Sequence, residues 1–175
     1  MRRQVARVLA WLAVEQFKQR FYRSPRQFWE EFRFLIGNRA RIRAVMGQNL
    51  IQPAFRERLM MAVTAVNGCR YCSYFHAREA LLTGISEAEV KTLLSGSVDH
   101  CPEEEAVAVL YAQHWAESDA CPDPDARRRL VETYGSEKAS AIELVLRMIR
   151  MGNLVGNTWD YFLYRISMGR WGLKV

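Results

Sequence analysis

The residues with the clearest chemical potential are two cysteines and a histidine within one short segment. The thiols of Cys69 and Cys72 are three positions apart, and His76 follows four positions after Cys72. Positions four apart share one face of a helix, so Cys72 and His76 can touch, and the two thiols are close enough to close a small disulfide loop. The thiolate is the reactive form of cysteine, and a neighbouring imidazole or a helix N-terminus promotes it. The spacing therefore indicates a redox or metal site.

Three chemistries commonly use two thiols at this spacing: thioredoxin-type exchange, a structural zinc site and peroxide reduction. Thioredoxin-type exchange needs strands around the motif, and the sequence offers none. A zinc site needs four Cys or His ligands, usually from two short-spaced pairs, and no second pair is present. A fourth ligand would have to come from His100, Cys101, His114 or Cys121. We therefore favour a site without metal, and a packed pair of buried cysteines stays open as an alternative.

A carboxylate on the preceding segment strengthens the redox interpretation. Glu57 lies twelve residues before Cys69, and the residues three, four and seven positions after it are uncharged. We therefore expect Glu57 to face the interior, whereas Arg56 and Arg58 reach solvent. A buried carboxylate needs a partner. That partner is either the His76 imidazole or an arginine.

Helical periodicity runs along almost the whole chain, with no two-residue alternation of the kind that strands show. Ser24 and Pro25 form a typical helix start, and Gly37 can end that helix. The predicted helices cover residues 1–17, 25–36, 53–66, 69–83, 86–94, 102–115, 124–134 and 136–168, the last as one helix or as two joined near Gly152. The sequence predicts an all-α fold.

Length and charge suggest how these helices are organised. At 175 residues the chain has the size of one domain. We expect a single all-helical domain over residues 1–175, with a basic N-terminal helical arm at 1–45 and a core at 50–98 that carries the motif. Residues 1–43 hold eleven of the 25 Lys/Arg and three of the 19 Asp/Glu, a net charge of +8, whereas the remainder carries −2.

The N-terminus bears on the cellular compartment. Its apolar run, Val8 to Val14, is bounded by Arg7 and Glu15 and has no cleavage site after it, so it does not fit a signal peptide. We expect a cytoplasmic protein, in which four cysteines argue against a structural disulfide framework. The basic arm raises nucleic-acid binding and peripheral membrane contact as options. Both are disfavoured against a solvated face or a contact with another subunit.

The motif residues resemble those of a known family. Glu57, an eleven-residue spacer, Cys69-x-x-Cys72, three residues and His76 are similar to the motif of the alkylhydroperoxidase D-like proteins of the carboxymuconolactone decarboxylase superfamily. The resemblance covers roughly residues 50 to 98. It implies an all-helical bundle of the alkylhydroperoxidase D-like type, and a homo-oligomer. The true decarboxylases of the superfamily generally lack the dithiol, so their activity is not carried over.

The resemblance also implies a role for each residue. Cys72 would be the peroxidatic thiolate that attacks a hydroperoxide, and Cys69 would resolve the sulfenic acid to give the Cys69–Cys72 disulfide. His76, held by Glu57, would move the protons. No metal, flavin or haem would be needed, and a lipoyl-bearing or thioredoxin-like protein would reduce the disulfide again. Tyr71 is a departure, since the best-known peroxidase of the family has a second histidine there.

Two further interpretations concern assembly. A non-enzymatic helical oligomer or partner-binding module, whose dithiol senses oxidation or simply packs, is the competing class of function. In the last predicted helix, polar residues recur at three- and four-residue spacing within an apolar segment: Asn153, Asn157, Asp160 and Tyr164. Such a ladder can line a pocket or fix a subunit interface, and we favour the interface.

Overall fold

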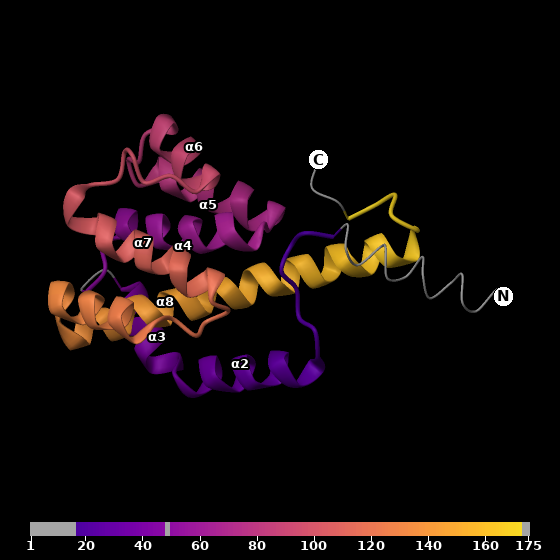
Figure 1. Cartoon of the computed structure of the whole chain (residues 1–175), viewed down its shortest axis with the longest axis horizontal. Coiled ribbons are helices and arrows are strands. Elements are labelled where there is room, and N and C mark those ends of the chain that lie inside the picture. The colour runs from indigo at the N-terminus through magenta and orange to yellow at the C-terminus, as the bar shows by residue number, and fades with distance from the viewer. Residues whose placement is uncertain (1–16, 48–49, 173–175) are drawn as a thin grey trace.

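The computed structural model describes residues 17–47 and 50–172, and the regular secondary structure in these ranges is entirely helical (Figure 1). The all-α prediction is therefore confirmed. The described helices are α2 (Pro25–Gly37), α3 (Arg39–Met46), α4 (Pro53–Asn67), α5 (Arg70–Leu82), α6 (Glu87–Ser95), α7 (Glu103–Glu117) and α8 (Pro124–Ile166). The helix predicted for residues 1–17 lies outside the described residues, except for Phe17.

Helix α4 is the centre of the core. It packs against α5, α6, α7 and α8, which surround it in Figure 1. Six consecutive residues, Leu59–Thr64, are buried, so more than one face of this helix is covered by neighbours. A helix covered in this way has no solvent face on which to place its charged side chains. Polar groups on α4 are therefore held by partners on the helices around it.

Helix α8 is the long helix that runs along the whole assembly, and its C-terminal half extends beyond the α4–α7 group (Figure 1). It begins at Pro124, after Asp123 accepts a hydrogen bond from the N–H of Asp125. The predicted break at Gly135 is present as a kink, with φ 75° and ψ 161°, a conformation that suits glycine. The helix continues through Gly152 without interruption.

The N-terminal described residues cover α8 from the other side. The segment 17–24 crosses α8, and α2 runs alongside it (Figure 1). Arg150 of α8 is buried and pairs with Glu31 of α2 and Asp119 of the loop after α7, which ties the three elements together. The short helix α3 was not predicted from the sequence. Among the described helices, none is both long and apolar enough to span a membrane.

Candidate active site

The two motif cysteines lie at the turn between α4 and α5. Gly68 ends α4 in the left-handed region, with φ 73°, and its N–H donates to the Thr64 carbonyl at 2.8 Å. A side chain at this position would be strained, and its Cβ would lie 3.3 Å from Cγ of Gln19. The turn makes Cys69 the N-cap of α5 and places Cys72 in the first helical turn. The predicted break at Gly68 thus directs both thiols to one point.

The two sulfur atoms are in direct contact. The Sγ atoms of Cys69 and Cys72 are 2.7 Å apart, and the backbone N–H of Cys72 donates to the Cys69 Sγ at 3.3 Å. Both thiols are free. Cys69 is fully buried, whereas Cys72 is partly exposed. Cys72 is therefore the sulfur that a molecule from solvent can reach.

The contact separates the acidities of the two thiols. The Cys72 thiol donates a hydrogen bond to the Cys69 sulfur, and backbone N–H groups at the start of α5 do the same, which lowers the pKa of Cys69 to about 7. The pKa of Cys72 is raised, first because its proton is held by Cys69 and second because it is partly buried. The pair therefore loses one proton near neutral pH and retains the second.

Glu57 and His76 form the second part of the site. Oε2 of Glu57 lies 2.8 Å from Nδ1 of His76, and both side chains are buried. Because a carboxylate only accepts hydrogen bonds, Nδ1 donates, and Nε2 is left for a ligand or a water. Arg56 also approaches, with its Nε 3.7 Å from Oε1 of Glu57. Both partners considered for Glu57 are thus present, and the closer one is the imidazole. Within the described residues, no direct hydrogen bond joins the His76 ring to either thiol.

The expectation that Arg58 reaches solvent is wrong. Arg58 is buried, and its guanidinium binds Glu89 of α6 at 2.5 and 3.3 Å and Glu105 of α7 at 3.1 Å. The reason is the central position of α4, because α6 and α7 cover the side that was assigned to solvent. This charge cluster holds α6 and α7 on the helix that carries Glu57.

The polar ladder of α8 also lies inside the subunit, so the interface interpretation is wrong for its buried contacts. Asn153 is fully buried, donates to Oγ1 of Thr64 at 3.1 Å and accepts from the Asn67 amide at 3.1 Å. Asn153 also hydrogen-bonds Cys72 and acts to lower the pKa of that thiol. Asn157 donates to the Asn67 carbonyl at 2.8 Å. The polar ladder of α8 therefore lines the inner side of the dithiol site, which we call the wall of the site.

Comparison with known families matches the part of the chain that contains this motif. Residues 32–114, a little under half of the chain, match the model of the carboxymuconolactone decarboxylase family. The chain is similar to this family over that segment, which contains Glu57, both motif cysteines and His76. The resemblance inferred from the motif is confirmed at the level of the family, over a longer segment than the one at 50–98. The comparisons with curated proteins and with solved structures gave no significant match.

Part of the wall lies outside the carboxymuconolactone decarboxylase segment, on α8. A Cβ atom at Gly156 would lie only 3.0 Å from Sγ of Cys69, so the absence of a side chain lets α8 touch the dithiol. One turn further, Oδ1 of Asp160 accepts from Arg70 and from the Tyr71 hydroxyl, both at 2.8 Å. Tyr71, the departure from the family pattern, is thus bonded to α8. The sequence signal for these contacts was a glycine within an apolar helix, together with the ladder.

The other thiols and imidazoles do not join this site. Cys101 is half-buried near Arg58, and burial raises its pKa to about 11, whereas Cys121 is exposed. His114 accepts a hydrogen bond from the backbone N–H of Asp123 at 3.0 Å. His100 is exposed. Within the described ranges, no cluster of three or more His, Cys, Asp or Glu side chains is arranged to hold a metal ion.

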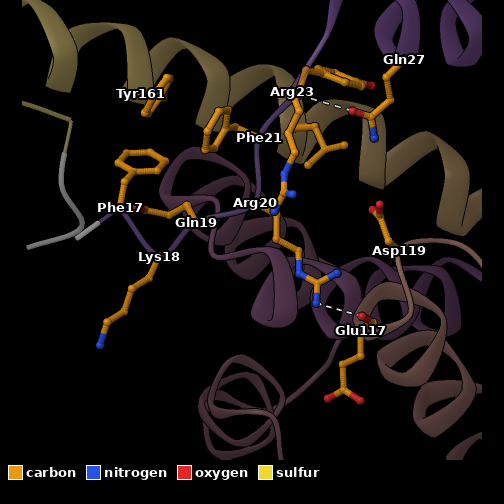
Figure 2. A pocket seen from close by; sticks show the side chains of 12 residues that line it. Phe17, Lys18, Gln19, Arg20, Phe21, Arg23, Gln27, Glu117, Asp119 and Tyr161 are labelled. Carbon is orange, nitrogen blue, oxygen red and sulfur yellow. Dashed lines mark hydrogen bonds between the residues drawn. The ribbon is translucent and has the colours of Figure 1, made fainter. Parts of the chain in front are cut away.

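A cavity lies away from the thiols, on the side of α8 that faces the N-terminal described residues. It has a volume of about 940 Å³ and lies between the segment 17–23, the end of α7 and α8, with Arg20 pointing across it (Figure 2). Arg20 binds the terminal carbonyls of α7, at Glu117 by a 2.9 Å hydrogen bond. Cys72 itself is partly exposed, and Tyr74 and Phe75, which follow it on α5, are 79 and 53 % exposed.

Proposed function

We propose that this protein is a thiol-dependent peroxidase or a related disulfide oxidoreductase that reduces hydroperoxides through Cys69 and Cys72. The observation that carries the proposal is the contact of two free thiols, 2.7 Å apart, at the start of α5, the helix whose His76 is paired with Glu57 of α4. Two thiols in contact can give up two electrons and form one disulfide. The carboxymuconolactone decarboxylase family includes such peroxidases as well as decarboxylases, and the dithiol favours the first group.

The first step takes place at Cys72, the partly exposed sulfur. The proton of the Cys72 thiol passes to Cys69, so that the single negative charge of the pair lies on Cys72. The Cys72 thiolate attacks the distal oxygen of the hydroperoxide, the O–O bond breaks, and the electron pair leaves on the alkoxide oxygen. Cys72 becomes a sulfenic acid, and the alkoxide takes a proton to leave as an alcohol. His76, whose Nδ1 is fixed by Glu57 at 2.8 Å, is the group on this helix that can supply that proton, directly or through water.

The second step takes place at Cys69. Cys69 is the more acidic thiol of the reduced pair, and after it gives up its proton its thiolate attacks the sulfenic sulfur of Cys72. The S–S bond forms, the S–O bond breaks, and the hydroxide takes a proton to become water. The net reaction consumes two thiols and one hydroperoxide and gives one disulfide, one alcohol and one water. Burial of Cys69 limits its competing reaction with molecules from solvent.

The protein that reduces the disulfide would meet the surface around Cys72. Tyr71, Tyr74 and Phe75 expose 44, 79 and 53 % of their surface beside the motif, which is an apolar area of the kind that protein partners cover. A lipoyl-bearing or thioredoxin-like protein carries the thiols needed for this exchange. A second apolar stripe, on the C-terminal half of α8, favours a homo-oligomer and comprises Val155, Trp159, Phe162 and Ile166.

Thiol counting with intact mass tests the proposal. The reduced protein is treated with one equivalent of cumene hydroperoxide, and the same is done for Cys72→Ser, Cys69→Ser and, as a control, Cys121→Ser. We expect the wild type to lose two thiols and the Cys69→Ser variant to hold a trappable sulfenic acid on Cys72. The Cys121→Ser variant should behave as the wild type, because Cys121 lies outside the site. Thiols that stay reduced would instead support the non-enzymatic alternative.

A further inference from the structure

Asp160 of α8 is a buried carboxylate that the proposed chemistry does not use. Its side chain is fully buried, Oδ1 accepts from Arg70 and Tyr71, and Oδ2 has no hydrogen-bond partner among the described residues. A buried carboxylate oxygen without a donor opposes folding. Arg70 does not need this partner, because its side chain is 37 % exposed and water can solvate it. A counter-ion role alone therefore leaves the burial of Asp160 unexplained.

We propose that Asp160 is a positioning residue for the dithiol: together with Arg70 and Tyr71, its carboxylate opposes negative charge on Cys69 and so favours the thiolate on Cys72. This inference rests on the proposed function and deepens it, because it concerns which of the two sulfurs is ready to attack a peroxide.

The geometry brings the carboxylate to the correct end of the dithiol. Gly156 lies against Cys69, and Asp160 is four positions later, on the same face of α8. Its two hydrogen-bond donors, Arg70 and Tyr71, directly follow Cys69 in the sequence. The guanidinium of Arg70 also lies over the Tyr71 ring, 4.8 Å from its centroid. Asp160 therefore clamps the first turn of α5 to α8 next to the buried sulfur.

The electrostatics of the two sulfurs make such an opposing charge useful. The N–H and thiol of Cys72 draw the negative charge to Cys69, which solvent cannot reach. Asp160 acts in the other direction and raises the pKa of Cys69. Among the described residues, Asp160 interacts with Arg70 and Tyr71 from α5 and with Cys69 from the turn, and Tyr164 follows one turn later along α8. Arg70 reduces the effect of the carboxylate, and the hydrogen bond from Tyr71 reduces it further.

Two substitutions with opposite expected effects test the inference. In Asp160→Asn the opposing charge is lost. The thiolate midpoint, which is the pH at which the thiolate absorbance of the reduced protein is half complete, should therefore fall by about one unit. At a pH above that midpoint, alkylation of Cys72 by iodoacetamide, mapped by mass spectrometry, should slow by up to about tenfold as charge moves to Cys69. In Tyr71→Phe the carboxylate loses one donor and keeps its charge, so the thiolate midpoint should rise.

A matched control is present on the same helix. Oε1 of Glu143 accepts from the Tyr111 hydroxyl at 2.8 Å and from Arg127 at 2.9 Å, the same set of donors as at Asp160, but its partners lie on α7 and α8 away from the motif. Glu143→Gln should leave the thiolate midpoint unchanged. If loss of an ion pair merely lowers stability, the Glu143→Gln variant should show that loss as well.

The outcomes are distinct. A thiolate midpoint unchanged in Tyr71→Phe and in folded Asp160→Asn overturns the inference, and so does a shift of both variants in the same direction. If Asp160→Asn does not fold, the Tyr71→Phe variant decides alone, because Tyr71 is half-exposed. An upward shift of its thiolate midpoint supports the inference, and no shift overturns it. None of these readouts needs peroxide turnover. If the thiolate midpoints shift as predicted but the thiols do not react with peroxide, the positioning role of Asp160 is supported and the proposed peroxidase function is rejected.

Discussion

Gly156 of α8 lies directly against Cys69: a Cβ atom at position 156 would stand 3.0 Å from the Cys69 Sγ and 3.3 Å from Cδ2 of Tyr71. This contact joins the long helix, which lies outside the family segment, to the buried half of the dithiol. The first turn of α5 can therefore keep its position only while residue 156 is small.

The Gly156→Val variant should separate the two helices at this point. The added side chain overlaps Cys69, so we expect a loss of about 1–3 kcal/mol in the free energy of unfolding of the reduced protein. We also expect slower disulfide formation with cumene hydroperoxide, because Cys69 is displaced from Cys72. Urea denaturation and thiol counting measure the two effects. Gly152→Val, at an exposed position of the same helix where a Cβ meets nothing within 4 Å, should change neither. Equal effects in both variants would contradict the prediction.

The Arg58→Met variant should be among the most destabilised single substitutions. It leaves Glu89 and Glu105 close together without their shared cation, and removal of one partner of a buried ion cluster costs about 3–5 kcal/mol. The loss should be smaller at mildly acidic pH. Burial already raises the pKa of Glu105, and without Arg58 that carboxyl takes up a proton more easily as the pH falls.

Urea denaturation at neutral and mildly acidic pH measures this. Arg128→Met is the control, since Arg128 also binds two carboxylates, Asp125 at 2.7 Å and Glu132 at 3.7 Å, but all three side chains are more than 60 % exposed. Its free energy of unfolding should change by less than about 1 kcal/mol. A similar loss in the two variants would mean that Arg58 is not buried in solution.

The elements with local signals were predicted well. Ser24 accepts from the N–H of Gln27 as an N-cap, with Pro25 in the first turn of α2. Ser86 likewise accepts from the N–H of Glu89 at the start of α6. Helix α3 was missed because its preceding residue, Asn38, makes no side-chain cap, and the helix is short.

The sequence allowed prediction of only those parts of the site that follow from the pattern within one helix or from the spacing between two consecutive helices. The uncharged neighbours of Glu57 correctly indicated an interior face, and the Cys-x-x-Cys-x3-His spacing gave the rest of the motif. The prediction that Arg58 reaches solvent failed because the sequence of α4 does not show how many helices surround it. The prediction that the polar ladder from Asn153 to Asp160 forms a subunit interface failed for a related reason. Periodicity shows that a helix has a polar stripe, but it does not say whether the stripe meets another subunit or the chain itself.

The charge of the dithiol should be visible in the stability of the reduced protein. The folded pKa of Cys69 is about 7, below its ordinary value of 9.0. Above pH 7 the unfolded chain therefore binds more protons than the folded one, and the free energy of unfolding rises with pH. The gain is absent below pH 7, grows between 7 and 9, and is complete above 9, where the unfolded thiol is ionised too. The raised pKa of Cys72 acts oppositely, and only above pH 9.

Chemical denaturation of the reduced protein between pH 6 and 10 tests this profile. We expect the stability of the wild type, relative to Cys69→Ser, to increase between pH 7 and 9 and to fall beyond it. The exposed thiol of Cys121 supplies the control, because Cys121→Ser should track the wild type across the range. A difference between wild type and Cys69→Ser that stays constant with pH would show that Cys69 is not the acidic thiol.

The Glu57→Gln variant examines the proton-transfer pair. The amide can still accept from Nδ1 of His76, but it no longer compensates positive charge on the ring when His76 shuttles a proton. We expect kcat for cumene hydroperoxide to fall by about 10²-fold, a typical contribution of a positioned acid–base group. Disulfide formation by a direct thiol oxidant such as diamide should be unaffected, because that reaction has no alkoxide to protonate.

Glu89→Gln provides the comparison that separates chemistry from folding. Glu89 is a second buried glutamate bonded to a basic side chain, Arg58, but it lies on α6 and away from the thiols. Its substitution should lower the unfolding temperature and leave kcat within about twofold of the wild type at temperatures where the protein is folded. Since both variants remove a buried negative charge next to α4, a loss of turnover confined to Glu57→Gln would assign the effect to His76. An equal loss in both would mean that α4 only supports the fold, and that the pair of Glu57 and His76 has no part in peroxide reduction.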